Sequence, residues 1–387
     1  MNTNEPRIIF GRPWFDEREE DLVLQTLRSG WIGQGPLVEL FERQLADYVG
    51  AREVVAVNSC TAGLHLALVA LGIGPGDEVI TTPFTFVATI NAITHTGATP
   101  IFVDIDRESL NLVPDAVEAA ATARTRAILP VHFGGRPLDS PGFHDLAEQH
   151  DLWIVEDAAH AIGAIADGQR VGGSGQPRTL TVFSFYPNKN LSSAEGGAIT
   201  TADSELADRL RRLRLHGLET DAWARYRTAG YRPSLAREAG FKYNWTDLQA
   251  AIALAQLEKL EGFLAAREYL AERYDELIRD VDDVKPVDRG PSGLEWRHAL
   301  HLYQVAVAGS PPRRDQVVTR VLADGIGAAV HYIGINHHPT YRSSETYPVS
   351  DWASQALITL PLHLHLGETD LERIVTSLSR ALEATQQ

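Results

Sequence analysis

The sequence predicts an α/β fold, with a mostly parallel seven-stranded sheet in a large domain and a smaller α+β domain at the C-terminal end. Short apolar runs alternate with helix-like stretches over residues 53–200, which is typical of βαβ units in a helix-covered parallel sheet. Polar residues cluster after three of these runs, where parallel sheets bind their ligands. Because 387 residues suffice for two domains, we expect a large domain over 1–250 and a linking helix with a small domain over 251–387.

Two helices are expected before the sheet. Phe15–Ser29 repeats leucine at helical spacing and is followed by Gly30, a residue common just after helix ends. A turn-rich connector over residues 31–36 leads to a second amphipathic stretch, Val38–Tyr48. Neither stretch carries a chemical motif of its own, so both are expected to be scaffold.

Seven apolar runs are predicted to form the strands of the sheet: Val54–Val57, Val79–Thr81, Ile101–Asp104, Ala127–Val131, Leu152–Asp157, Thr181–Tyr186 and Ala198–Thr200. Helices are expected between several of them, at Leu64–Leu71, Thr85–Thr96 and Pro114–Ala123. A helical crossover returns the chain to the same end of a sheet. The alternation therefore favours parallel neighbours.

Helices dominate the C-terminal half. Leu206–His216 is rich in arginine and leucine, and the polar, aromatic stretch Gly217–Tyr243 is typical of a long loop or hairpin. Thr246–Leu277 is expected to form one long amphipathic helix or a broken pair. The small domain is then predicted from strands at His301–Val307 and Ala328–Tyr332 and from helices at Arg314–Ala323 and Glu368–Leu382.

Composition excludes several classes of partner. The 35 basic and 51 acidic residues give a net charge of −16, so nucleic-acid phosphates and anionic membranes would be repelled. No 18-residue apolar run and no apolar leader are seen, so neither a membrane span nor export is expected. The single cysteine, Cys60, cannot form an intrachain disulfide, which suits a reducing cytoplasm. We therefore predict a cytoplasmic protein.

One lysine stands out as a candidate for covalent chemistry. Only four lysines occur (Lys189, Lys242, Lys259 and Lys285), and Lys189 directly follows a predicted buried strand. An amine can form a Schiff base with the aldehyde of pyridoxal phosphate, whereas a guanidinium cannot. The alternative is a solvated loop residue, which is the commoner role of lysine.

Other side chains at the same strand ends could complete a pyridoxal phosphate site. The cofactor needs a carboxylate at its ring nitrogen, because the protonated ring is the effective electron sink. Asp157 ends a predicted buried strand and is the candidate, while His160 and Ser184 are available for the ring oxygen and the phosphate. The small residues Asn58–Gly63, between a strand and a helix, could present backbone N–H groups to a phosphate. Simple helix capping is the commoner role of such residues.

Seven ordered motifs carry a resemblance to a known family: Asn58–Leu68, Gly74–Val79, Pro83–Thr89, Glu156–His160, Phe183–Asn190, Glu195–Ala198 and Tyr243–Ala250. Over nearly its whole length the chain resembles the sugar aminotransferases of the DegT/DnrJ/EryC1/StrS group, pyridoxal phosphate enzymes of the aspartate aminotransferase fold type, fold type I. The resemblance implies that Lys189 binds the cofactor covalently and then moves a proton between substrate and cofactor. It also implies that Asp157 pairs with the ring nitrogen.

The remaining cofactor contacts implied by the resemblance are Phe86, stacked on the ring, and Thr61, Ala62 and Ser184 at the phosphate. For Phe86 the alternative is an ordinary core residue. Asn244 matches a position that reaches the phosphate of a neighbouring subunit, which implies a homodimer with shared active sites. Two residues depart from the commoner pattern. His160 replaces glutamine, and Trp245 replaces methionine, a change expected to alter packing more than chemistry.

The implied reaction is a ping-pong transamination from L-glutamate to a keto group of a nucleotide sugar. The intact Lys189 favours this over the family's deoxygenating branch, in which histidine replaces the lysine. Segments His216–Tyr226, Gly327–Ile333 and His337–Tyr341 resemble members that act on 4-keto-6-deoxy sugars. The substrate-contact candidates are His331, His338, Trp223, Tyr226 and Arg232.

Three alternatives remain open. The acceptor could be a keto-cyclitol, or the enzyme could be a related dehydratase. The chain could also be a non-catalytic cofactor-binding regulator, although it has a complete catalytic set and no appended DNA-binding domain. Finally, a histidine cluster could bind a metal, with His363 and His365 on one strand face. No metal is expected, because no cysteine or carboxylate lies at ligand spacing beside these histidines.

Overall fold

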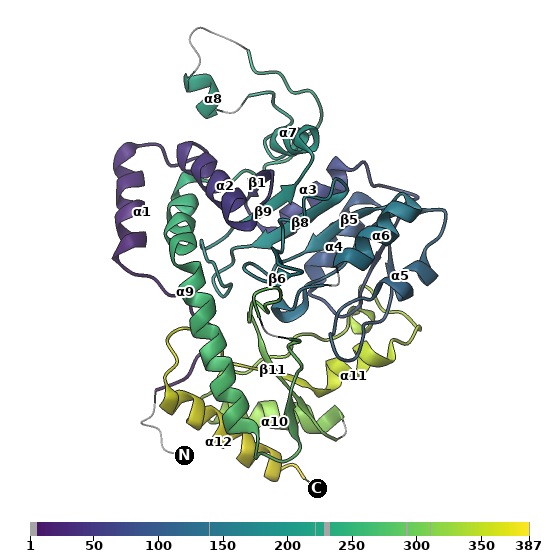
Figure 1. Ribbon diagram of the computed structural model, residues 1–387, viewed down its shortest axis with the longest axis vertical. Helices are drawn as coiled ribbons and strands as arrows, with labels where there is room; N and C mark the ends of the chain where they lie inside the picture. The colour runs from purple at the N-terminus through teal and green to yellow at the C-terminus, as the bar shows by residue number, and fades with distance from the viewer. Residues whose placement is uncertain are drawn as a thin grey trace.

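The computed structural model describes residues 6–138, 140–220, 222–227, 233–291, 293–309 and 311–386. A large sheet with helices on both faces forms one part of the molecule, and a small sheet with its own helices forms the other (Figure 1). The long helix α9 (Asp247–Ile278) runs along both parts. It is a single helix of 32 residues, so the alternative of a broken pair is wrong.

The large sheet contains the seven predicted strands: β1 (Glu53–Val57), β2 (Glu78–Thr81), β3 (Thr99–Phe102), β4 (Thr125–Leu129), β5 (Trp153–Asp157), β8 (Thr179–Ser184) and β9 (Gly197–Thr201). Their spatial order is β1-β9-β8-β5-β4-β2-β3. Only β9 runs against its two neighbours, and the other pairs are parallel. The prediction of a mostly parallel seven-stranded sheet is confirmed. Strands buried on both faces need continuous apolar runs, which is why the sequence reveals them.

Helices cover both faces of this sheet, as the alternation within β1 shows. Val55 and Val57 face the core around α3 (Cys60–Ala70), while Val54 and Ala56 face the core around α2 (Pro36–Val49). The other covering helices are α1 (Glu17–Ser29), α4 (Val87–Thr96), α5 (Pro114–Ala120), α6 (Ser140–His150) and α7 (Ser204–Leu213). Among them, α6 was not predicted.

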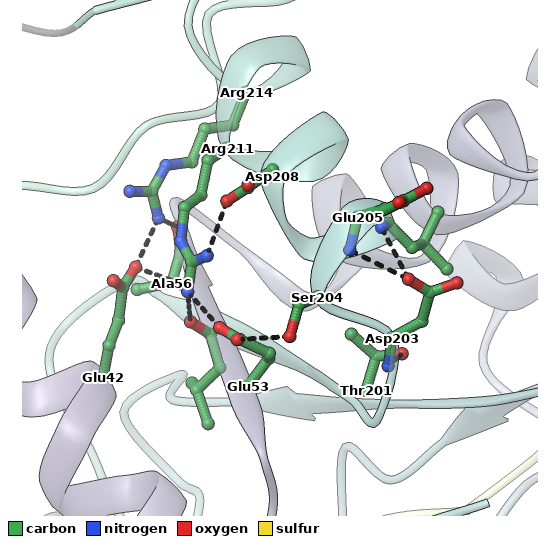
Figure 2. A network of polar contacts seen from close by, with 12 residues as sticks. Glu42, Glu53, Ala56, Thr201, Asp203, Ser204, Glu205, Asp208, Arg211 and Arg214 are labelled. Atoms are coloured by element: carbon green, nitrogen blue, oxygen red, sulfur yellow. Dashed lines mark hydrogen bonds and ion pairs between the residues drawn. The ribbon is translucent and has the colours of Figure 1, made fainter. Parts of the chain in front are cut away.

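A buried ion pair ties β1 to two of these helices (Figure 2). Arg214, just after α7, lies 2.5 Å from Glu42 Oε1 and donates to the carbonyl of Ala56 over 2.7 Å. Glu42 also accepts the backbone N–H of Ala56 over 2.9 Å. Both side chains are almost completely buried. This network fixes the edge strand of the sheet against α2 and α7.

The small sheet is antiparallel, with strands β10 (Val284–Pro286), β11 (Tyr303–Val307) and β12 (Leu357–Leu360) in that order. Its helices are α10 (Pro311–Ala323), α11 (Pro348–Ala356) and α12 (Glu368–Glu383). Arg267 of α9 is buried and donates to the carbonyls of Leu300 and Leu362, which joins the long helix to this part. The predicted boundary at residue 250 falls within the first turn of α9, and the division into two domains stays a prediction.

Two predictions for the C-terminal part are wrong. Ala328–Tyr332 is not a strand, since it makes a single bridge, between Ala329 and Thr359. His363 and His365 do not share a strand face, because they follow β12 and their rings lie 3.1 Å from the carbonyls of Ile9 and Pro13.

The segment predicted as a loop or hairpin between α7 and α9 pairs with itself at two bridges, Leu215 with Lys242 and Leu218 with Ala236. It carries the short helix α8 (Ala222–Arg227) at its outer end (Figure 1). The remaining elements are the small hairpin β6 (Ile165–Ala166) and β7 (Gln169–Arg170) and two 3-10 turns at Phe133–Gly135 and Ile335–His337. Among the helices of the described residues, none is long and apolar enough to cross a bilayer.

Candidate active site

A cavity of about 410 Å³ lies at the carboxyl ends of β5 and β8. This volume is in the usual range for small-molecule sites. Its walls include most of the side chains predicted for the cofactor, namely Thr61, Phe86, Asp157, His160, Ser184 and Lys189. A larger hollow of about 760 Å³ lies beside α9, but neither Lys189 nor Asp157 lines it. The chemistry therefore points to the smaller cavity.

Lys189 places a buried amine in this cavity. Its backbone N–H donates to the carbonyl of Tyr186 over 2.9 Å, in a turn that directly follows β8. Its Nζ lies 3.4 Å from Nε2 of His301. Burial lowers the pKa of Lys189 to about 8, although Cys60 and Asp157 raise it in part. A larger share of this amine is thus unprotonated near neutral pH than for a solvated lysine, as a nucleophile requires.

Asp157 presents a buried carboxylate at the end of β5. Its oxygens accept the hydroxyl of Thr89 over 2.8 Å and the N–H of Ala159 over 3.1 Å, and the thiol of Cys60 lies 4.0 Å away. Among the described residues it has no ion-pair partner within 4.0 Å. Burial raises the pKa of Asp157, which these hydrogen bonds oppose only in part. A cation bound beside this carboxylate would favour its ionised form.

His160 is held in one tautomer by its neighbours. The N–H of Gly134 donates to Nδ1 over 3.3 Å, so Nδ1 carries no proton. Burial lowers the pKa of His160 well below 6.5, so the ring is neutral and its proton lies on Nε2. This nitrogen is 3.1 Å from the hydroxyl of Tyr332. His160 is therefore a hydrogen-bond donor toward the cavity. The phenolic oxygen of pyridoxal phosphate requires such a donor.

The first turn of α3 forms the opposite end of the cavity. Ser59 caps this helix by accepting the N–H of Ala62 over 3.1 Å, so the capping alternative applies to Ala62. Ala62 does not line the cavity, and its predicted phosphate contact is thereby weakened. Thr61 and Ser184 do line it. Both remain predicted phosphate contacts. Thr61 lies in the first turn of α3, where backbone N–H groups lack intrahelical partners, and Ser184 offers its hydroxyl.

Phe86 is not an ordinary core residue. It precedes α4, lines the cavity and is 57% exposed, which is unusual for a large apolar ring. Its ring lies 6.0 Å from that of Tyr332. A flat ligand would find an apolar face here.

The structure does not bring every predicted site residue to the cavity. His331 lines it, and its Nδ1 lies 2.9 Å from the hydroxyl of Thr359. Asn244 and His338 lie outside it. Trp223 and Tyr226 also lie outside it, where Trp223 meets the ring of Trp31 edge-on and Tyr226 packs against it at a tilt. Arg232 falls outside the described residues.

Sequence reasoning missed several residues of the cavity, among them His301 and Tyr332. Tyr332 lies inside one of the substrate-like segments, next to His331, so that segment was a usable signal. His301 lies two residues before the first residue of β11 and looks like part of a strand in the sequence. Nothing local marks it as a partner of Lys189.

Trp245 fixes another wall of the cavity. Its fully buried indole packs against Phe41 and Phe185, which agrees with the expected packing role. Its Nε1 also donates to the carbonyl of Glu195 over 2.9 Å, and Gln249 donates to the same oxygen over 2.7 Å. The residue that replaces methionine therefore holds a loop that lines the cavity.

The side chains of this cavity fit pyridoxal phosphate. They combine an amine with a lowered pKa, a buried carboxylate without a cation, and an exposed aromatic ring. A neutral donor and a helix N-terminus complete the set. No other cofactor class was predicted from the sequence.

Comparisons with known proteins agree with this site. The model of the DegT/DnrJ/EryC1/StrS aminotransferase family matches residues 13–379. The spore coat polysaccharide biosynthesis protein SpsC of Bacillus subtilis (strain 168) is 41% identical over 377 residues, which cover 95% of each chain.

Solved structures agree as well. Spr1654 of Streptococcus pneumoniae in its PLP form superposes with a TM-score of 0.89 at 30% identity, over 98% of this chain and 100% of that one. Helicobacter pylori PseC, an aminotransferase involved in the biosynthesis of pseudoaminic acid, gives a TM-score of 0.90 at 27% identity, with the same coverage.

These comparisons confirm three predictions: the family, the fold type and the dependence on pyridoxal phosphate. They do not test the role of any single residue. The match to the family model spans nearly the whole chain, so it is not limited to one motif or one domain. The chain belongs to the DegT/DnrJ/EryC1/StrS family of pyridoxal phosphate-dependent sugar aminotransferases.

Proposed function

We propose that this enzyme transfers the amino group of L-glutamate to a keto group of a nucleotide-linked sugar, in two half-reactions that share one cavity. The observation that carries the proposal is the meeting of the buried Lys189 amine and the unpaired Asp157 carboxylate in that cavity. The names of two relatives, a polysaccharide biosynthesis protein and an aminotransferase of pseudoaminic acid biosynthesis, support a carbohydrate acceptor.

Each side chain has one task in this proposal. Bound pyridoxal phosphate supplies an electron sink for negative charge at the carbon that loses or gains the amino group. Asp157 would hold the ring nitrogen protonated, and His160 would donate its Nε2 proton to the ring oxygen. Phe86 would cover one face of the ring and exclude water. The Nζ of Lys189 would take a proton from the substrate carbon and return it, which requires a neutral amine.

We also propose that the active enzyme is a homodimer. Asn244 lies just before α9 and outside its own cavity, and among the described residues its side-chain amide hydrogen-bonds only to the neighbouring carbonyl of Trp245. This supports a contact with the cofactor phosphate of the partner subunit. Of the proposed substrate contacts within the described residues, His331 is the one that lines the cavity together with Lys189. His338, Trp223, Tyr226 and Arg232 stay predictions.

The acceptor can be tested directly. Purified enzyme with ¹⁵N-labelled glutamate should transfer label to a 4-keto-6-deoxy nucleotide sugar, and a panel of keto-sugar nucleotides would identify the carbon. Lys189→Ala should abolish both transfer and the visible absorbance of covalently bound cofactor. Lys285→Ala, in the short strand β10, is the matched control and should change neither. Transfer only to keto-cyclitols, or loss of a hydroxyl without transfer, would contradict the proposed acceptor.

The shared site has its own test. Mixed dimers of Asn244→Ala and Lys189→Ala chains should recover activity, because one of the two cavities then draws both residues from unmutated sequence. Mixtures of Lys189→Ala and Asp157→Asn chains should be no more active than either variant alone, because we expect Asp157 and Lys189 of each site to come from the same chain. Recovery in neither mixture would argue against shared sites.

A further inference from the structure

One histidine from the loop that leads into the small sheet reaches the reactive lysine. His301 lies two residues before the first residue of β11, whereas Lys189 follows β8 of the large sheet. Its Nε2 is 3.4 Å from Nζ of Lys189, and its side chain is buried. The ring packs against that of His160, with centroids 4.4 Å apart and the ring planes tilted by 36°. This contact therefore joins the two parts of the molecule at the amine.

The second nitrogen of His301 limits where the ring can carry its proton. Nδ1 is buried and has no hydrogen-bond partner among the described residues. The ring is neutral, since burial and the charge of Lys189 lower its pKa well below 6.5. A neutral imidazole carries one proton, on either Nδ1 or Nε2. A proton on Nδ1 would leave a buried N–H donor unpaired, which folded proteins rarely tolerate.

This constraint couples the ring to the state of the lysine. An ammonium has three donors and no acceptor, so it can pair only with a bare Nε2, which forces the ring proton onto Nδ1. A neutral amine has a lone pair that accepts Nε2–H and leaves Nδ1 bare. When the amine is neutral, every N–H of the His301 ring has an acceptor. When it is an ammonium, the N–H at Nδ1 is buried without one. The contact therefore favours the free amine.

The other groups around the amine do not supply this preference. Asp157 on β5 and Cys60 at the start of α3 both favour the ammonium form. His160 and His331 are neutral because burial lowers the pKa of both rings, and Tyr332 keeps its proton because burial raises its pKa. Apart from burial itself, His301 is thus the group in direct contact that opposes Asp157.

We propose that His301 is a positioning residue for Lys189, whose Nε2–H donates to the Nζ lone pair and holds the amine unprotonated and aimed into the cavity. This inference rests on the proposed role of Lys189. The same bond would keep the amine unprotonated whenever it is free during turnover. His301 lies just before β11, so the smaller part of the molecule contributes to the amine's reactivity.

The test uses the protein without cofactor and measures capture of pyridoxal phosphate, not turnover. The second-order rate of capture, followed by visible absorbance across pH 6–10, reports the pKa of the amine. In His301→Gln the side chain offers an amide oxygen, an acceptor that can pair with an ammonium without the change of ring tautomer that histidine needs. We expect the apparent pKa to rise by about one unit, which lowers the capture rate at pH 7 about tenfold.

Two controls make the result specific. His298→Asn keeps an acceptor for the N–H of Leu300, which His298 Nδ1 binds over 2.8 Å, and changes the same loop away from the amine. Its capture profile should match that of the unmutated chain. If His301→Gln does not fold, as judged by thermal unfolding, His301→Asn provides the same amide acceptor in a shorter side chain.

Each outcome separates the inference from the function on which it rests. No capture by the unmutated chain, or unchanged capture by Lys189→Ala, would overturn the proposed role of Lys189. Normal capture with an unchanged profile in His301→Gln would overturn only the role of His301. A lowered pKa in that variant would show that His301 stabilises the ammonium instead, and would equally overturn the inference.

Discussion

Two of the regions that bury charged side chains in this molecule treat them differently. In the network beside β1, Arg214 meets Glu42 and the carbonyl of Ala56, so charge is compensated within the protein (Figure 2). In the cavity, Lys189 and Asp157 are buried without an ion-pair partner within 4.0 Å among described residues. The first arrangement secures an edge strand. The second leaves two buried ionisable groups whose partners must come from a bound ligand.

The largest effect on stability is expected when the buried ion pair beside β1 is removed. Arg214→Gln leaves the carboxylate of Glu42 buried and unpaired, and should lower the free energy of unfolding by about 3–5 kcal/mol. Arg211→Gln is the matched control, because Arg211 of α7 pairs with Glu53 of β1 but is 32% exposed. Its loss should cost about 0–1 kcal/mol. Equal losses in urea unfolding would contradict the distinction between these two pairs.

The next effect concerns the uncompensated region. Asp157→Asn removes the charge that we assign to the ring nitrogen, and should lower kcat by about 10²–10³-fold. Burial raises the pKa of Asp157, so the ionised carboxylate costs stability when no cofactor is bound. The cofactor-free variant should therefore be at least as stable as the unmutated protein at pH 7. A clear loss of stability would contradict this assignment.

Glu156, the residue before Asp157, extends the comparison to the pH dependence of stability. Burial raises the pKa of Glu156, but His132 at 3.5 Å and the hydroxyl of Thr181 outweigh burial and hold it below its usual value. The stability that Glu156 contributes is present above pH 4.5 and is lost as pH falls through its lowered pKa. For Asp157 the sign is opposite, since stability is lost as pH rises from 3.8 through its raised pKa.

Unfolding of cofactor-free protein between pH 3 and 7 should reveal this difference. Relative to the unmutated protein, Glu156→Gln should become less stable as pH rises, and Asp157→Asn more stable. Parallel curves for the two variants would show that adjacent carboxylates on β5 share one environment.

The smallest effect concerns the loop that Trp245 holds. Trp245→Phe keeps an aromatic ring against Phe41 but removes the bond to Glu195, which Gln249 still makes. A loss of about 0.5–1.5 kcal/mol in stability is expected. Trp245→Met restores the commoner residue of the family and serves as the comparison. A larger effect on cofactor binding than on stability would show that the loop acts mainly on the site.

The sequence predicts the large sheet well because buried parallel strands need continuous apolar runs. The small sheet is harder. β10 is only three residues long and contains lysine and proline, and β12 follows α11 without a glycine or proline between them. In the cavity, Lys189, Asp157, Ser184 and Phe86 lie in local motifs and could be predicted. His301 could not, because its contact with Lys189 depends on how the two parts pack.

The antiparallel pairing of β8 with β9 has a consequence for how the enzyme can vary. The segment that carries Lys189 leaves β8 and returns to the adjacent strand, so both of its ends are anchored at the same rim. An insertion or deletion there would displace the amine from the carboxylate on β5, with no free end to absorb the change. Variation in length should therefore be confined to the outer hairpin between α7 and α9.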